Sequence, residues 1–351
     1  MTRAERVLQW TRPNLRALKP YYKAPLDGSP LRLDQNTNLY GRNPALDAVT
    51  PPDADQYPTR DADDLLAALA DFHGLRPEHF VVGNGSDEIL DLLTKTFTAP
   101  GQTLACPMPS YSLYPFYAQL QDLRVQQVRL NSKYGLDVEG LLAAEADLTL
   151  IATPNNPTGN VPDEADLERL LAQSTGVVVL DEAYIEYAGL GKSWLSRVEE
   201  YDNLGVMRTF SKAYGLAGLR IGYLAGNTDL IERLRLVKPP FNLNTYSEAV
   251  AVAAIDRQEW VDDVVAQTRL ERTRLAEALT QRGFKVHPSD ANFLLTEHAE
   301  DPAVIHGGLR DRGVLVRTFP GKEGLERKVR FGIGRPEHTD RLLAALDEVL
   351  A

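Results

Sequence analysis

The hydrophobic positions between residues 80 and 225 fall into short continuous runs, and stretches with helical periodicity separate these runs. Short apolar runs rich in β-branched residues are typical of strands that are buried on both faces of a sheet. Seven such strands are expected, at 80–82, 103–106, 125–130, 149–152, 177–180, 205–209 and 220–225. Their alternation with helices predicts an α/β fold whose large domain has a mostly parallel sheet flanked by helices.

The helical stretches begin and end at residues that commonly cap helices. A helix is expected over 61–73, because Asp61 provides an acidic start and Gly74 a stop. Further helices are expected to open near Ser86, Tyr111, Asp137 and Asp163. Residues 1–44 contain scattered proline, glycine and asparagine and are expected to form an irregular arm.

The pattern changes after Pro239 and Pro240, and this change predicts a second, smaller α+β domain. A long helical stretch from about 247 to 282, interrupted near Gln258, precedes the last strands and a final helix over 336–350. The strands are expected at 284–287, 292–296, 314–317 and 329–332. The predicted parts are an N-terminal arm over 1–44 that joins the small domain, a large domain over 45–240 and a small domain over 241–351.

Length and charge narrow the class of protein. A chain of 351 residues is longer than most single domains, which supports two domains. Hydrophobic residues make up 43% and charged residues 25%, values that exclude a disordered chain. Acidic residues (49) exceed basic residues (38), and the net charge of −11 disfavours nucleic acid as a partner.

Several common features are missing from the sequence. No apolar run approaches the roughly 20 residues that cross a bilayer, and the first residues lack the apolar core of a secretory signal, so no membrane partner is expected. The single cysteine, Cys106, cannot form an internal disulfide, which fits a reducing cytoplasm. The six histidines show no metal-ligand spacing, so no metal site is expected.

Residues 83–90 read Gly-Asn-Gly-Ser-Asp-Glu-Ile-Leu and join a predicted strand to a predicted helix. Free N–H groups at the start of a helix favour an anion, and the glycines let the backbone approach it. Taken alone, a capped helix after a turn also explains this segment.

Two further segments follow predicted strands at the carboxyl edge, where open α/β sheets bind ligands. Residues 153–159 read Thr-Pro-Asn-Asn-Pro-Thr-Gly, a rigid turn that carries two amides. Asp181 ends the apolar run 177–180, and Tyr184 follows it within reach of the same crevice. A carboxylate at a buried strand end needs a cation or a hydrogen-bond donor. The alternative is an aspartate that caps the next element.

The fourth segment surrounds Lys212 with hydroxyls, aromatic rings and glycines after the strand at 205–209. A lysine with a depressed pKa forms Schiff bases with carbonyl compounds, whereas a single lysine is more often a surface residue. Pyridoxal 5′-phosphate explains the four segments together. Its aldehyde needs Lys212, its ring nitrogen needs Asp181, and its phosphate needs the helix start, hydroxyls and Arg220.

These segments resemble those of fold-type I pyridoxal-phosphate aminotransferases, and the sequence is most similar to the histidinol-phosphate aminotransferases among them. The resemblance extends from about Leu33 to the last helix. It implies transamination between an amino donor, histidinol phosphate, and 2-oxoglutarate, with pyridoxal 5′-phosphate as cofactor. It also implies a cytoplasmic homodimer with shared active sites and a place in histidine biosynthesis.

The resemblance implies roles for residues that match the family's motifs. Lys212 is the Schiff-base lysine and proton shuttle, Asp181 pairs with the ring nitrogen, and Tyr111 stacks on the ring. Asn156 and Tyr184 hydrogen-bond the ring's 3-oxygen. The cofactor phosphate is held by Ser86, Asp87, Thr209, Ser211 and Arg220, and by Tyr57 of the neighbouring subunit. Taken singly, Tyr111 could belong to an apolar helix face, Tyr57 to a surface turn and Thr209 to a strand.

On the substrate side, the resemblance implies that Arg317 and Arg330 hold the anionic end of the substrate. Asn292 fits the nearby wall, and Tyr21 or Tyr22 and Asn36 belong to the arm that faces the substrate. Each arginine could instead be an exposed charge.

The arm departs from the family pattern, because residues 36–39 read Asn-Thr-Asn-Leu where Asn-Glu-Asn-Pro is usual. The missing carboxylate could have met an imidazole, so an aromatic amino-acid aminotransferase is an alternative. A pyridoxal-phosphate lyase, such as a threonine-phosphate decarboxylase, and a non-enzymatic regulator are further alternatives.

Overall fold

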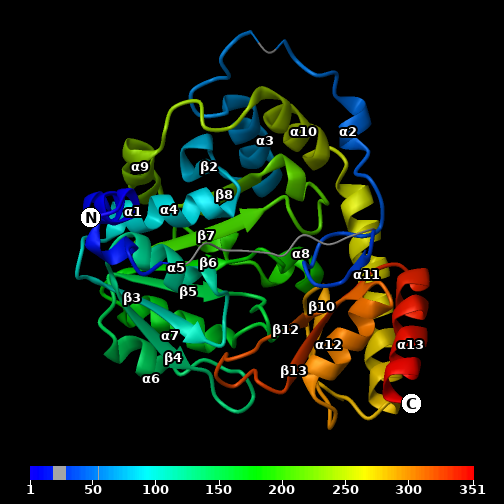
Figure 1. Ribbon diagram of the computed structural model, residues 1–351. Coiled ribbons are helices and arrows are strands. Elements are labelled where there is room, and N and C mark those ends of the chain that lie inside the picture. Colours follow the sequence, from blue (N-terminus) through cyan, green and yellow to red (C-terminus); the bar gives the residue numbers. More distant parts are fainter. Residues whose placement is uncertain (19–28, 54) are drawn as a thin grey trace.

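A seven-stranded sheet forms the centre of the computed structural model, which describes residues 1–18, 29–53 and 55–351 (Figure 1). Its order is β2-β8-β7-β6-β5-β3-β4, and β8 alone runs antiparallel to its neighbours. The strands are β2 (Phe80–Asn84), β3 (Thr103–Met108), β4 (Arg124–Arg129), β5 (Leu148–Ala152), β6 (Val177–Asp181), β7 (Leu204–Thr209) and β8 (Ile221–Gly226). The predicted α/β fold with a mostly parallel sheet is confirmed, and each strand end lies within two residues of its expected position.

Helices cover both faces of this sheet, because alternate residues of a buried strand point to opposite sides. Val179 packs in one apolar cluster with residues of α4, α5 and α9. Val178 and Leu180 pack in the other cluster with residues of α3, α6, α7 and α10. The helices are α3 (Asp63–His73), α4 (Ser86–Phe97), α5 (Leu113–Leu120), α6 (Val138–Ala143), α7 (Glu164–Gln173), α9 (Thr228–Val237) and α10 (Thr245–Ile255), with the short α2 (Ala45–Ala48) and α8 (Ile185–Ala188).

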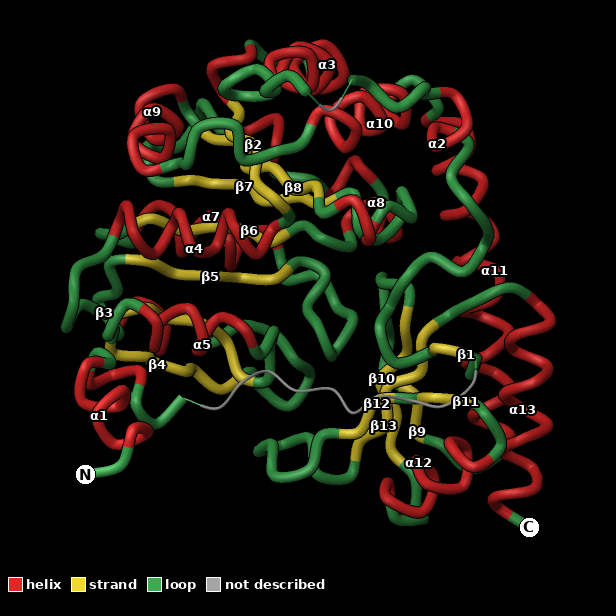
Figure 2. The backbone as a smooth tube through the Cα atoms, turned by 45° about the horizontal axis from the view of Figure 1, so that its top comes forward, coloured by secondary structure: helices red, strands yellow, loops and turns green. Residues whose placement is uncertain are grey.

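A smaller antiparallel sheet, of order β12-β13-β10-β9, lies beside the large one (Figure 2). Its strands are β9 (Lys285–Val286), β10 (Phe293–Glu297), β12 (Arg317–Thr318) and β13 (Lys328–Gly332). Helices α11 (Gln258–Gln281), α12 (Pro302–Asp311) and α13 (Pro336–Leu350) contribute to its apolar cluster. The arm joins this part, since β1 (Leu31–Arg32) pairs in parallel with β11 (Val314–Leu315).

Helix α11 connects the two apolar clusters. Val261 and Val265 near its start belong to the cluster of the large sheet, whereas Leu275 and Leu279 belong to that of the small sheet. Helix α10 follows residue 240 and contacts α3 and α2 of the large domain. The division at residue 240 therefore stays a prediction, and a boundary within α11 fits this packing better.

Three helices of eight or more residues were not expected from the sequence. Helix α1 (Arg3–Trp10) lies within the predicted irregular arm and starts with a capping box between Thr2 and Glu5. Asn227 caps α9 and Asp301 caps α12, each through its side-chain oxygen. The capping signals are present in the sequence, but the helices that they open are only 8 to 10 residues long. Such short helices depend on tertiary packing, which local patterns do not report.

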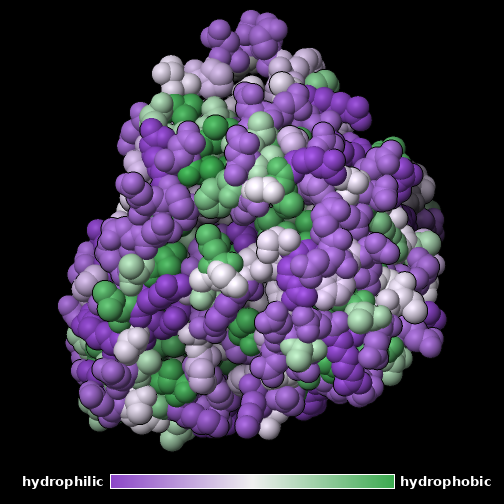
Figure 3. Space-filling view, turned by 180° about the vertical axis from the view of Figure 1, so that it is seen from behind, coloured by the Kyte–Doolittle hydropathy of each residue, from purple (hydrophilic) through white to green (hydrophobic). Residues whose placement is uncertain are grey.

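Hydrophilic side chains dominate the face shown in Figure 3, and apolar residues are scattered among them. Among the described residues, no helix combines the length and the apolar character needed to cross a membrane.

Candidate functional site

The carboxyl ends of β5, β6 and β7 bring the predicted chemical groups together. Asp181 is the last residue of β6 and lies between Ala152 of β5 and Met207 of β7. Its side chain is buried, with the Tyr114 hydroxyl donating to Oδ2 at 2.7 Å and the Ala183 N–H donating to Oδ1 at 3.1 Å. This edge of the sheet therefore holds a carboxylate with a fixed direction.

Burial raises the pKa of Asp181 to about 6, although the hydrogen bonds from Tyr114 and Ala183 oppose this rise. Asp87 raises the pKa further, and the nearby Lys212 lowers it. A buried carboxylate of this kind is stabilised by a cation placed against it. The protonated ring nitrogen of pyridoxal phosphate is such a cation, so Asp181 fits the predicted cofactor.

Lys212 lies in the turn after β7 and is half-buried. Its Nζ is 5.6 Å from the centre of the Tyr184 ring and donates to the Gln35 carbonyl oxygen at 3.4 Å. The amine and the carboxylate of Asp181 thus come from the ends of neighbouring strands, as the sequence predicts for a Schiff-base lysine and its ring-nitrogen partner.

The start of α4 forms a cradle with the loop before β8. Gly85 has φ +80°, and a Cβ at this position would overlap the Arg220 guanidinium. A Cβ at Gly222 would overlap the Ser86 backbone N–H group, so both glycines permit a close approach. Arg220 Nη2 donates to Asp87 Oδ2 at 3.0 Å.

The donors of this cradle suit a phosphate group. The first N–H groups of a helix have no partner within the helix, and here Ser86 and Asp87 supply them. Hydroxyls lie on the facing turn, where Thr209 Oγ1 donates to Ser211 Oγ at 2.9 Å. With the Arg220 guanidinium, the donor set has the chemistry that the cofactor phosphate requires.

The arm and the small domain bring their predicted residues to the same edge. Asn36 Nδ2 donates to the Tyr184 hydroxyl at 3.1 Å, and Asn292 Nδ2 donates to the Asn36 carbonyl oxygen at 3.0 Å. Arg330 Nη1 donates to Asn156 Oδ1 at 2.6 Å, although the two residues are 174 positions apart. The buried side chains of Asn36, Asn292 and Arg330 thus lie beside Tyr184 and Asn156, which are predicted to bind the cofactor.

The other predicted site residues differ in their exposure and in their contacts. Tyr57 is 84% exposed, and its ring packs against Phe241 with centroids 5.2 Å apart. Arg317 is exposed and lies opposite Arg330 in the β12–β13 register, with its guanidinium 6.0 Å from the Phe319 ring centre. Tyr111 is half-buried just before α5. Tyr21 and Tyr22 lie outside the described residues.

Sequence reasoning missed a buried ion pair beside Asp181. Arg208 Nε lies 3.0 Å from Glu182 Oε2, and both side chains are almost completely buried. Glu182 also accepts hydrogen bonds from the Ser193 hydroxyl and the Trp194 N–H, each at 2.7 Å. An arginine inside an apolar strand was the available signal, because such a charge needs a partner.

Two histidines hydrogen-bond within the large domain, where His79 is buried and His73 is half-buried. His79 is 3% exposed and hydrogen-bonds the Gly226 carbonyl oxygen at 3.1 Å. His73 Nε2 lies 3.0 Å from the Tyr223 hydroxyl, and burial lowers the pKa of His73 to about 3. Within the described ranges, no group of three or more His, Cys, Asp or Glu residues could hold a metal ion.

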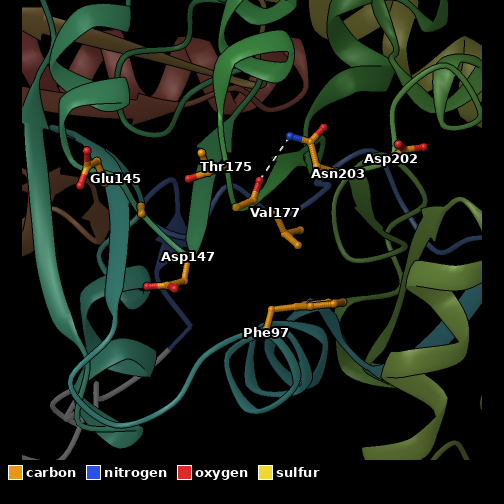
Figure 4. Close-up of a pocket in the computed structure, with 9 residues that line it drawn as sticks. Phe97, Glu145, Asp147, Thr175, Val177, Asp202 and Asn203 are labelled. Atoms are coloured by element: carbon orange, nitrogen blue, oxygen red, sulfur yellow. Dashed lines mark hydrogen bonds between the residues drawn. The ribbon is translucent and has the colours of Figure 1, made fainter.

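A cavity of about 330 Å³ lies at the opposite edge of the sheet, where β5, β6 and β7 begin (Figure 4). It is lined by acidic residues, among them Asp147 and Asp202, together with Asn203 and Phe97. The Asp147 carboxylate accepts hydrogen bonds from Gln102 and from the Thr103 N–H. The predicted chemical groups lie at the other edge.

The fold and the residues at the carboxyl edge define a pyridoxal-phosphate enzyme. The chain belongs to the aminotransferase class I and II family, whose family model matches residues 30–346. It is therefore a pyridoxal-phosphate-dependent aminotransferase, as the sequence predicted, and the alternative of a non-enzymatic regulator is set aside.

Three proteins that are similar to this chain are named histidinol-phosphate aminotransferase. The histidinol-phosphate aminotransferase of Roseiflexus castenholzii is 39% identical over 366 aligned positions, which cover 96% of this chain and 97% of the relative. That of Caldanaerobacter subterraneus subsp. tengcongensis is 37% identical over 84% of each chain. The structure of histidinol-phosphate aminotransferase from Sinorhizobium meliloti in complex with pyridoxal-5′-phosphate aligns with a TM-score of 0.87 at 27% identity, covering 97% of each chain.

Proposed function

We propose that this aminotransferase moves an amino group from histidinol phosphate to 2-oxoglutarate, in two half-reactions that share one site. The observation that carries this proposal is the juxtaposition of Lys212 and Asp181 at the ends of β7 and β6. The choice of donor is supported by the relatives, which are named histidinol-phosphate aminotransferases at 37–39% identity.

Each residue at the carboxyl edge has a separate role in the proposed reaction. When bound, pyridoxal phosphate supplies an electron sink for the substrate carbon that loses its proton. Asp181 would hold the proton on the ring nitrogen, and Tyr184 and Asn156 would orient the ring through its 3-oxygen. The Lys212 amine would hold the aldehyde end of the cofactor and would take and return the substrate's proton.

Arg317 and Arg330 are proposed to bind the anionic end of both substrates. They stand opposite each other on β12 and β13, so their side chains start from the same face of the sheet. A phosphate or a carboxylate between the two guanidinium groups would accept paired hydrogen bonds from them.

A homodimer is proposed because the Tyr57 side chain is exposed and its ring packs against Phe241 rather than against a predicted cofactor residue. Its exposed hydroxyphenyl group is free to approach the phosphate cradle of a second copy, as the resemblance implies. The cytoplasmic location rests on the sequence, whose lone Cys106 is buried and unpaired in the structure. Both statements are predictions that size measurements and fractionation can test.

A panel of amino donors tests the proposed substrate. The purified holoenzyme would react in a single turnover with histidinol phosphate, phenylalanine, tyrosine and alanine, and the oxo product would be measured for each. Histidinol phosphate should exceed phenylalanine in kcat/KM by about tenfold or more, since a phosphate of higher charge gains more from two guanidinium groups than a carboxylate does. A faster reaction with phenylalanine or tyrosine would replace the donor, and release of carbon dioxide would indicate a lyase.

A further inference from the structure

Tyr114 is a fully buried tyrosine of α5 whose hydroxyl meets a charged group. Tyr114 is 0% exposed, and its hydroxyl donates to Asp181 Oδ2 at 2.7 Å. Buried tyrosine hydroxyls usually find a hydrogen-bond partner, and most of their partners are neutral. Here the partner is the carboxylate at the end of β6, which is 67 residues away in the sequence.

The two oxygens of Asp181 are therefore held by two different elements. Oδ2 accepts from the side chain of Tyr114, and Oδ1 accepts from the backbone of Ala183. The backbone bond would survive almost any substitution in this region, whereas the Tyr114 bond depends on a single hydroxyl. Because a hydrogen bond to a charged acceptor is strong and directional, this hydroxyl fixes the direction in which the carboxylate points.

The ring of Tyr114 has a second contact at the same edge. It packs edge to face against Tyr111, with ring centres 5.4 Å apart and an angle of 82° between the planes. Tyr111 is the residue that would stack on the cofactor ring, and Asp181 is the one that would meet the ring nitrogen. One buried side chain thus touches both groups that would define the position of this ring.

We propose that Tyr114 is the positioning residue for the cofactor ring: its hydroxyl directs the Asp181 carboxylate at the ring nitrogen, and its own ring sets the plane of Tyr111. This inference rests on the role of Asp181 given under the proposed function and on the stacking role that the family resemblance implies for Tyr111. Tyr114 itself touches neither cofactor nor substrate in this scheme. It acts through the two residues that do.

The electrostatics of Asp181 agree with this role. Burial raises its pKa to about 6, and the Tyr114 hydrogen bond is the largest opposing influence. The other ionisable groups that face Asp181 are Asp87 on α4, which raises the pKa, and Lys212 after β7, which lowers it. Loss of the Tyr114 hydroxyl should therefore move the pKa of Asp181 upward, because a donor to the ionised form has been removed.

Tyr114→Phe tests the proposal because phenylalanine keeps the ring and its volume and removes only the hydroxyl. We expect the Kd for pyridoxal phosphate, measured on the cofactor-free protein at pH 7.5, to rise about 10- to 100-fold, the range for a lost hydrogen bond to a charged group. The loss of affinity on acidification should begin about one pH unit higher than in the parent. The KM for the amino donor should change less than kcat.

Tyr223→Phe is the matched control. Tyr223 is also a buried tyrosine of the large sheet, but its hydroxyl contacts His73 and the Arg208 guanidinium rather than Asp181. This variant should bind pyridoxal phosphate like the parent. If the Tyr223 and Tyr114 variants weaken binding equally, the effect is a general loss of packing and the proposal is wrong.

A double-mutant cycle with Asp181→Asn shows whether Tyr114 acts through the carboxylate. In the Asp181→Asn background, Tyr114→Phe should change the Kd for pyridoxal phosphate less than threefold. An undiminished effect there, or an unchanged Kd in the single variant, would overturn the proposal. These readouts report on the cofactor site alone, so an error in the proposed amino donor would leave them unaltered.

A second variant keeps the test decisive if Tyr114→Phe does not fold. Incorporation of 3-fluorotyrosine at position 114 retains the ring and makes the hydroxyl a stronger donor. The acid limb of pyridoxal phosphate affinity should then move toward lower pH. An unmoved acid limb would contradict a role for this hydroxyl at Asp181.

Discussion

The two edges of the seven-stranded sheet carry similar residue types but differ in how their charges are paired. At the amino edge, the half-buried Asp147 accepts hydrogen bonds from Gln102 at 2.6 Å and from the Thr103 N–H at 2.9 Å. Both donors are neutral, and the half-buried side chain keeps part of its exposure to solvent. At the carboxyl edge, Asp181 is buried, its pKa is raised to about 6, and Lys212 lies nearby. Only this second carboxylate gains from an added cation.

The comparison shows that charge requirements mark the site better than cavity size. The cavity at the amino edge measures about 330 Å³, and a second cavity of about 720 Å³ lies against α11, next to residues 286–289. Neither is lined by Lys212 or Asp181. A binding edge is recognised instead by buried groups whose ionised forms lack full compensation within the chain.

The largest effect is expected from Lys212→Ala, which removes the amine from the carboxyl edge. In the proposed mechanism both the covalent attachment and the proton transfer depend on this amine, so kcat should fall by at least about 10⁴-fold. Steady-state turnover with a saturating donor measures this loss. A variant that still turns over within tenfold of the parent would remove Lys212 from the chemistry.

Asp181→Asn should lower kcat by about 10²- to 10³-fold and also change stability in a pH-dependent way. The folded-state pKa of about 6 lies above the ordinary value near 4, so the cofactor-free folded protein binds this proton more tightly than the unfolded chain does. Its stability should therefore rise as the pH falls from 7 toward 4, by up to about 3 kcal/mol from this group.

The substitution removes that dependence. Denaturant unfolding of the cofactor-free protein should give Asp181→Asn a higher free energy of unfolding than the parent at pH 7, and a smaller difference at pH 4. If the parent and the variant differ in free energy of unfolding by the same amount at pH 7 and pH 4, the Asp181 carboxylate is already stabilised by groups of the chain.

Arg330→Ala should act on substrate affinity rather than on the cofactor. The KM for anionic donors and for 2-oxoglutarate should rise about 10- to 100-fold, since a hydrogen-bonded charge pair is lost. The Kd for pyridoxal phosphate should change much less, although Arg330 contacts Asn156. An unaltered KM for every anionic substrate would make this arginine structural.

The smallest effect is expected at the amino edge. Asp147→Asn keeps the shape of the side chain and lies far along the strands from Asp181, so kcat and the Kd for pyridoxal phosphate should stay within about twofold of the parent. Because Asp147→Asn and Asp181→Asn make the same substitution at opposite edges of the sheet, a difference between them reflects the position of the carboxylate and not the residue type. A large loss of cofactor affinity in Asp147→Asn would remove the distinction between the two edges.

The cofactor half of the site could be predicted from the sequence because its residues follow buried strands directly. Asp181 ends β6 and Lys212 comes three residues after the end of β7, so a local pattern locates them at one edge. The role of Tyr114 could not be found this way. Its contact with Asp181 depends on the order of the strands and on the way α5 packs over them, neither of which local periodicity contains.

The contacts of the residues around the proposed substrate site could not be predicted from the sequence for the same reason. Arg330 and Asn156 meet across 174 residues, and Arg208 finds Glu182 only because β6 and β7 are neighbours. The burial of His79 and the partial burial of His73 likewise result from tertiary packing. The residue types in the sequence indicate that these polar side chains need partners, but the identity of each partner depends on the fold.

Reduction with borohydride tests the central claim most directly, because it fixes a Schiff base as a stable secondary amine. The purified protein would be saturated with pyridoxal phosphate, reduced, digested and sequenced by mass spectrometry. The phosphopyridoxyl group should be found on Lys212. A group found on another lysine, or no labelled peptide at all, would contradict the assignment of this edge as the active site.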